Sequence, residues 1–140
     1  MIFGNGPEHY GIWKDFKVLP VISVSPVRRP KLDPSGTRYC FDLERELMME
    51  KMRVILRIAA VWKHRDICLG AFGAGPIYRN PVEEIAKMWR TILFEEQEFR
   101  GAFSNVVFAI EKGQDSGNES GLSDLEVFKR VFEPSTVFQQ

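Results

Sequence analysis

The sequence is poor in the features that mark several specialised classes of protein. Its 140 residues include only two cysteines, Cys40 and Cys68, too few for a disulfide framework and too far apart for a zinc knuckle. No apolar run approaches the roughly 20 residues that span a bilayer. The first residues also lack the basic start and apolar core of a signal peptide. We therefore expect an intracellular protein, cytoplasmic or nuclear, that has no membrane partner.

An excess of charge is also absent. The 19 lysines and arginines balance 19 aspartates and glutamates, which gives a formal charge of zero and an isoelectric point near 6.7. This balance provides no basic field for nucleic acid, so we expect no direct nucleic-acid partner, and any bound anion must be held by a local site. The composition, 44% hydrophobic and 27% charged, and the length suit about one globular domain.

Hydrophobic periodicity predicts that strands and helices alternate along the chain. Short apolar runs predict strands at residues 21–24, 67–69 and 106–110. Apolar residues at three- and four-residue steps predict helices over 42–62, 81–94 and 123–132. The order β-α-β-α-β-α predicts an α/β fold, a three-layer α/β/α sandwich with right-handed crossovers. Three strands form only a partial sheet, whose unpaired edges attract other chains.

Residues that favour helix starts precede each predicted helix. Asp42 is expected to cap the first helix and Asn80 the second, where Glu83 has the spacing of a capping box. Ser123 and Glu126 have the same spacing before the last helix. These residues set the expected boundaries of the helices.

The sharpest candidate site is the glycine-rich segment that follows the strand at 67–69. Glycines let backbone N–H groups approach a ligand closely, and the start of the next helix adds partial positive charge. At the carboxyl end of a parallel strand, this combination suits a phosphate or diphosphate. The alternative, which the pattern leaves open, is that the glycines only form a tight turn. The candidate binding residues are Gly70, Ala71, Phe72, Gly73, Ala74, Gly75, Tyr78 and Asn80.

Other residues capable of chemistry have simpler interpretations. The acidic run 95–98 is expected to be a solvated helix end, and His64 a charge near the end of a helix. Cys68 is predicted to be a buried, inert core thiol and Cys40 an idle one. Arg28–Arg29 form either surface charge or part of the crevice that holds the glycine-rich segment. No catalytic residue, metal ligand or cofactor is assigned.

Several blocks of the sequence, in order, resemble the catalytic domain of microbial-type poly(ADP-ribose) glycohydrolases, most closely its fungal members. The resemblance covers roughly residues 1–133, with a mobile linker expected at 113–122 and a tail at 134–140. It implies a macrodomain-related fold that binds ADP-ribose at the carboxyl ends of its strands. It further implies that residues 70–75 surround the diphosphate and that Phe72 packs near the adjoining ribose. The matching blocks are residues 19–30, 52–60, 69–75, 79–84, 105–110 and 128–132.

The sequence departs from this family at the catalytic motif. Family enzymes carry a glycine triplet followed by Gln-Glu-Glu, and a glutamate of this motif protonates the leaving ribose oxygen. Neither motif occurs here, and residues 95–97 have a different order and follow the diphosphate loop. The resemblance therefore predicts a truncated domain that begins mid-fold, keeps the diphosphate loop and is inactive or nearly so as a hydrolase.

Two alternatives to a truncated glycohydrolase domain remain. One is a non-catalytic module that binds ADP-ribose, another nucleotide or an ADP-ribosylated protein, because binding requires the loop but not the glutamate. The other is an interaction fragment that pairs its exposed sheet edge with another chain, including a second copy of itself. Whether the chain is an enzyme is left open at this point.

Overall fold

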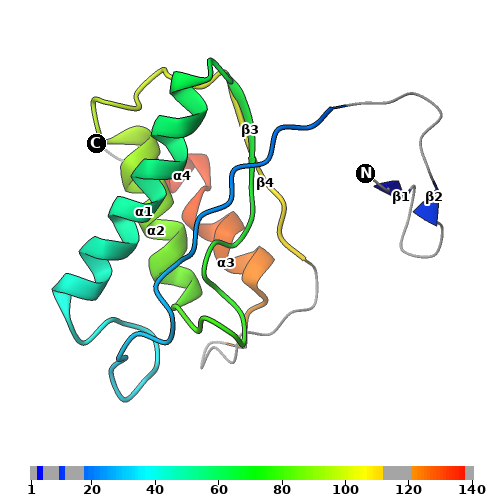
Figure 1. Cartoon of the computed structure of the whole chain (residues 1–140). Coiled ribbons are helices and arrows are strands. Elements are labelled where there is room, and N and C mark those ends of the chain that lie inside the picture. Colours follow the sequence, from blue (N-terminus) through cyan, green and yellow to red (C-terminus); the bar gives the residue numbers. More distant parts are fainter. Residues whose placement is uncertain (1–2, 5–9, 12–17, 112–120, 138–140) are drawn as a thin grey trace.

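The computed structural model describes residues 3–4, 10–11, 18–111 and 121–137 (Figure 1). Most of the predicted linker, residues 113–120, lies outside them. The elements are β1 (Phe3–Gly4), β2 (Tyr10–Gly11), α1 (Asp42–Val61), β3 (Asp66–Leu69), α2 (Val82–Phe94), β4 (Asn105–Phe108), α3 (Asp124–Val131) and α4 (Pro134–Val137).

A two-stranded parallel sheet forms the centre of the fold. β3 pairs with β4 in register, from Asp66 opposite Asn105 to Leu69 opposite Phe108, and α2 connects the two strands. A separate antiparallel ladder joins β1 to β2. The prediction of an α/β fold with a parallel sheet is confirmed, as are the strands at 67–69 and 106–110, the second displaced by one to two residues.

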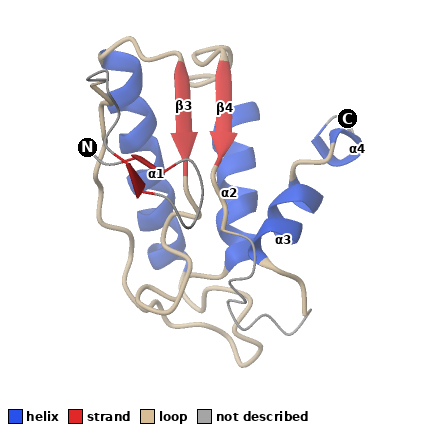
Figure 2. Ribbon diagram, turned by 90° about the vertical axis from the view of Figure 1, so that its right-hand side faces the viewer, coloured by secondary structure: helices blue, strands red, loops and turns tan. Residues whose placement is uncertain are grey.

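The hydrophobic core lies between one face of the sheet and the helices. Figure 2 shows β3 and β4 in front of α1 and α2, and α2 packs between α1 and α3. Trp89 is at its centre, with its ring 6.4 Å from those of both Phe72 and Phe108. The other large, fully buried side chains are Met48, Met52, Leu56, Val82, Ile85, Met88, Ile92 and Val127.

The other face of the sheet, called the open face here, is covered by no helix in the described part of the chain. Asp66 and Cys68 of β3 and Asn105 and Val107 of β4 are exposed, while the residues between them face the core. The residues that the structure describes therefore provide a sheet and one helical layer of the predicted sandwich. The prediction that Cys68 is a buried thiol is wrong, because its side chain is on the open face.

The strand predicted at residues 21–24 is wrong. This stretch is extended but belongs to no sheet of the described residues, and it runs beside α1 and β3 (Figure 1). Pro20 and Pro26 flank the stretch and have no N–H to donate to a ladder. A cavity of about 730 Å³, lined by residues 19–24 on one side and by β3 on the other, separates this segment from the sheet.

The structure tests the predicted starts of α1 and α3 as follows. The N-cap of α1 is Phe41, without a side-chain hydrogen bond, so Asp42 belongs to the first turn and its prediction as a cap is wrong. Its carboxylate still favours the positive end of the helix. At α3 the capping box of Ser123 and Glu126 is confirmed, with Glu126 Oε2 accepting from the Ser123 backbone N–H at 2.8 Å.

Candidate functional site

The glycine-rich segment forms the loop that leaves the carboxyl end of β3 and enters α2. Gly73 and Gly75 have φ values of 80° and 88°, in the left-handed region. Within the described residues, the backbone N–H groups of Ala71, Gly73 and Gly75 donate to no protein acceptor. Three unused donors beside a helix N-terminus are the arrangement that accommodates an anionic group.

Asn80 fixes the shape of this loop. Its side chain is 3% exposed, and its Nδ2 donates to the carbonyls of Val27 at 2.7 Å and Gly73 at 2.9 Å. Its Oδ1 accepts a hydrogen bond from the Tyr39 hydroxyl at 2.8 Å. The Asn80 amide is therefore engaged on both sides within the protein, and it joins the glycine loop to Val27 and Tyr39, which are 53 and 41 residues away in sequence.

The predicted N-cap role of Asn80 is wrong. The N-cap of α2 is Pro81, and no side chain caps the helix start. The Asn80 side chain instead turns towards Val27 and Gly73. Glu83, expected to complete a capping box, pairs with Lys87 at 2.9 Å and with Arg130 at 2.8 Å.

The loop glycines differ in what requires them. A Cβ at Gly73 would lie 2.7 Å from Met48 Cε, 2.9 Å from Asn80 Nδ2 and 3.0 Å from Pro26 Cβ, so close packing and the left-handed φ together favour glycine there. A Cβ at Gly70 would meet nothing within 4 Å, and the φ of Gly70 is outside the left-handed region. A tight turn therefore explains Gly73 but gives no reason for glycine at position 70.

Tyr39 is a site residue that sequence reasoning missed. It pairs with Leu32 in an isolated antiparallel bridge, so the 32–39 loop presents its hydroxyl to Asn80. Burial raises the pKa of Tyr39, which keeps the hydroxyl protonated as a donor to Asn80 Oδ1. Because Tyr39 precedes Asn80 by 41 residues, no local motif pointed to this contact.

The two aromatic residues of the predicted site lie at different points of the loop. Phe72 is partly exposed and packs edge-on against Trp89. The Tyr78 carbonyl accepts a hydrogen bond from the Arg29 backbone N–H at 2.6 Å. This bond brings the segment after Pro26 against the glycine loop.

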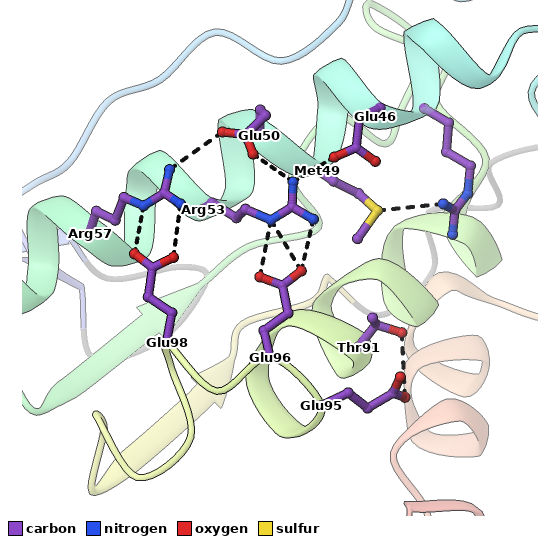
Figure 3. A network of polar contacts seen from close by, with 10 residues as sticks. Glu46, Met49, Glu50, Arg53, Arg57, Thr91, Glu95, Glu96 and Glu98 are labelled. Atoms are coloured by element: carbon purple, nitrogen blue, oxygen red, sulfur yellow. Dashed lines mark hydrogen bonds and ion pairs between the residues drawn. The ribbon is translucent and has the colours of Figure 1, made fainter.

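Two of the three glutamates in the acidic run after α2 form ion pairs, and Glu95 instead accepts from the Thr91 hydroxyl at 3.5 Å (Figure 3). Glu96 binds Arg53 through contacts of 2.8–3.1 Å, and Glu98 binds Arg57 at 2.6 Å. Glu95 and Glu98 are exposed, so the predicted solvated helix end is confirmed, and Glu96 and Glu98 in addition join it to α1. The hydrogen bond from Arg57 lowers the pKa of Glu98, whereas a general acid requires a raised pKa.

Other features of catalytic or membrane proteins are missing from the described ranges. They contain no group of three metal-ligating side chains and no helix long and apolar enough to cross a membrane. His64 lines the cavity beside β3. Cys40 is an exposed free thiol.

Comparison with solved structures connects the loop to a known fold. The chain matches the poly(ADP-ribose) glycohydrolase of Deinococcus radiodurans in complex with ADP-ribose, at 29% identity and a TM-score of 0.56. This match covers 66% of the chain. The apo form of the same enzyme matches with a TM-score of 0.53 over 64% of the chain. The chain contains a poly(ADP-ribose) glycohydrolase-like domain.

The match confirms the macrodomain-like α/β fold and shows how much of the glycohydrolase the chain covers. The chain spans about a third of the length of the glycohydrolase structures, 34% for the ADP-ribose complex and 33% for the apo form. No protein-family model matches the sequence, and no curated protein matches it either. The fold of this glycohydrolase-like domain thus rests on structural likeness together with moderate sequence identity.

Proposed function

We propose that this chain binds ADP-ribose, free or attached to a protein, and that residues 70–75 hold the diphosphate. The observation that carries the proposal is the set of unused N–H groups of Ala71, Gly73 and Gly75. Backbone donors fixed in place bind an anion without the cost of ordering flexible side chains. The similarity to a glycohydrolase solved with ADP-ribose supports the same ligand.

Four of the predicted binding residues have separate places in this proposal. Gly70 leaves open space through which a ligand reaches the backbone, and Phe72 provides an apolar ring for the adjoining ribose. Tyr78 lies where the loop meets Arg29. Asn80 acts as a positioning residue, because its amide is already engaged by protein partners.

The proposal is for binding without hydrolysis by these 140 residues. Cleavage of the glycosidic bond requires a carboxylic acid poised to protonate the leaving oxygen. The sequence has neither a glycine triplet nor Gln-Glu-Glu. Glu96 is paired with Arg53 and Glu98 with Arg57, and the hydrogen bond from Arg57 lowers the pKa of Glu98 and so favours its ionised form.

A thermal melt with and without millimolar ADP-ribose tests the proposal. Preferential binding to the native state raises Tm. Gly70→Val should abolish the shift while leaving Tm without ligand nearly unchanged, since its Cβ meets open space. Ala60→Val, at an exposed position near the end of α1, is the control and should keep the shift. An unshifted wild-type melt, or a full shift with Gly70→Val, would contradict the proposal.

A second candidate function, self-association through the open sheet, is favoured by one observation. Val107 is 57% exposed on the open face, and the edge of β3 away from β4 carries no ladder in the described part of the chain. Unpaired strands of this kind recruit other strands. Light scattering should then report a dimer that Val107→Lys dissociates, whereas a monomer at high concentration would reject this function.

A further inference from the structure

Arginine occupies two backbone positions that disfavour it. The non-glycine residues with positive φ in the described ranges are Arg29 at 49°, Lys63 at 59° and Arg79 at 58°. The left-handed region carries an energetic cost for a residue with a long side chain, a cost that glycine and asparagine largely avoid. A cation retained at such a position therefore requires an explanation.

Lys63 has a local explanation at the end of a helix. Arg79 closes a single turn, in which its N–H returns to Gly75 O, whereas no helix or turn of this kind precedes Arg29. Lys63 follows α1, where a left-handed residue commonly ends a helix and a cation stabilises the negative helix end. Its N–H donates to Ala60 O at 2.9 Å, as part of this helix ending. Arg29 and Arg79 follow no helix.

The two arginines belong to neighbouring loops at the candidate site. Arg29 N donates to Tyr78 O at 2.6 Å, so its backbone lies next to that of Arg79. Arg79 N donates to Gly75 O at 2.9 Å, which fixes it to the glycine loop. Both side chains are exposed, as is that of Arg28.

These arginines also lack carboxylate partners. In the described ranges no ion pair involves Arg28, Arg29 or Arg79, and Arg79 Nε donates only to Pro76 O at 3.2 Å. On α1, by contrast, Arg45, Arg53 and Arg57 are all paired with glutamates. The positive charge beside the glycine loop is therefore available to an anion.

We propose that Arg29 and Arg79 form a second phosphate subsite beside the glycine loop, with Arg28 adding charge. The subsite would hold a phosphate outside the diphosphate that residues 70–75 bind, and it rests on the proposed function. The planar guanidinium of arginine suits phosphate oxygens because it donates two parallel hydrogen bonds. The phosphate has two possible sources: a phosphate ester on the same ADP-ribose, or the diphosphate of an attached unit.

Calorimetric titration of the whole chain tests the subsite with three probes. These are ADP-ribose, ADP-ribose 2′-phosphate and a linear oligomer of two ADP-ribose units. At low salt, at least one of the two larger probes should bind about tenfold more tightly than ADP-ribose. The probe that gains affinity identifies the source of the phosphate, and the gain should shrink in 0.5 M salt.

Matched variants separate the subsite from general charge effects. The double variant Arg29→Asn with Arg79→Asn should remove the tenfold gain and change ADP-ribose affinity less than twofold, since asparagine tolerates positive φ. Lys63→Asn removes one charge from the same backbone conformation at a distant site and should keep the gain. The corresponding glycine variants replace the asparagine ones if these do not fold, as judged by circular dichroism.

The outcomes distinguish the subsite from the diphosphate loop. Equal affinity for all three probes would overturn the subsite while ADP-ribose binding stands. The same follows if Lys63→Asn reduces the affinity gain of the larger probes as much as the arginine double variant does. Binding of a larger probe but not ADP-ribose, with loss in the arginine variant, would support the subsite and overturn the loop assignment. Absence of binding by every probe would overturn both.

Discussion

Two clusters of polar contacts hold distant segments of this chain together, and they differ in environment. The Asn80 cluster joins Val27, Tyr39 and Gly73 through uncharged, largely buried groups at 2.7–2.9 Å. The clasp, made by Arg53 and Arg57 with the glutamates around them, consists of charged and mostly exposed groups at 2.6–3.4 Å. Contact distances therefore do not separate the two clusters.

The difference lies in what replaces each contact when it is lost. A buried donor or acceptor left without its partner costs about 1–3 kcal/mol, because water cannot reach it. An exposed ion pair contributes about 0–1 kcal/mol, because water and salt solvate the separated charges. The charged clasp should therefore contribute less to stability than the neutral cluster that shapes the candidate site.

The largest effect is expected from Asn80→Ala. The substitution removes two donors and one acceptor and leaves the carbonyls of Val27 and Gly73 without this partner. We expect a loss of about 3 kcal/mol in the free energy of unfolding, measured by urea denaturation, and loss of ADP-ribose binding as the loop relaxes.

Asn105→Ala is the matched control for Asn80. The exposed Asn105 side chain donates a single hydrogen bond, to Asp66 Oδ1 at 2.7 Å, so its removal should cost well under 1 kcal/mol. Similar losses at the two asparagines would show that burial does not decide the energetics of these contacts.

A smaller effect is expected from Tyr39→Phe, which deletes one hydroxyl and keeps the ring. The Oδ1 of Asn80 then has no donor, at a cost of about 1–2 kcal/mol. Tyr78→Phe removes a hydroxyl that makes no hydrogen bond in the described residues, and it should leave stability unchanged. If Tyr39→Phe weakens ADP-ribose binding at a temperature where the variant is still folded, Tyr39 supports binding by holding the loop. If the Tyr39→Phe and Tyr78→Phe variants are equally stable, the Tyr39 hydrogen bond does not have that role.

The next smaller effect on the free energy of unfolding is expected from Arg53→Gln in the clasp. Arg53 is only 13% exposed and binds three glutamates, Glu46, Glu50 and Glu96, so Arg53→Gln should cost about 1 kcal/mol. The loss should diminish in 1 M salt, which screens the pairs in the wild type. Lys51→Gln, on the same helix without an ion pair, controls for the loss of one charge. A salt-independent loss at Arg53 would indicate packing of its aliphatic stem instead.

Local patterns in the sequence predicted one part of this structure and not the rest. Helical periodicity located all three large helices, the apolar runs located β3 and β4, and spacing alone identified the capping box of Ser123 and Glu126. These features depend on residues within a few positions of one another. The strand at 21–24 failed because strand formation also depends on a partner, which a run of β-branched residues does not supply.

The candidate site likewise contains some features that local sequence patterns predicted and others that they did not. The glycine loop was found from local spacing, because the turn and helix start lie within a dozen residues. The contacts of Asn80 with Tyr39 and Val27 and of Glu96 with Arg53 were not, because these partners are 41 to 53 residues apart in sequence. Nor did the sequence separate Gly73, which close packing and a left-handed φ favour, from Gly70, which they do not.

The smallest effect is expected from Arg57→Gln and depends on pH. Hydrogen bonding to Arg57 lowers the pKa of Glu98 below its ordinary value of 4.5. A carboxylate with a lowered pKa in the folded state stabilises the fold above the unfolded pKa, and this stabilisation is lost as pH falls through the folded pKa. Arg57→Gln removes the main cause of the lowered Glu98 pKa, so the variant should have a slightly lower Tm than the wild type at pH 7. The two Tm values should converge as pH falls through the lowered folded pKa of Glu98, because Glu98 is then protonated in both proteins. A Tm difference that does not narrow with falling pH would assign the effect of Arg57 to packing of its aliphatic stem rather than to its charge.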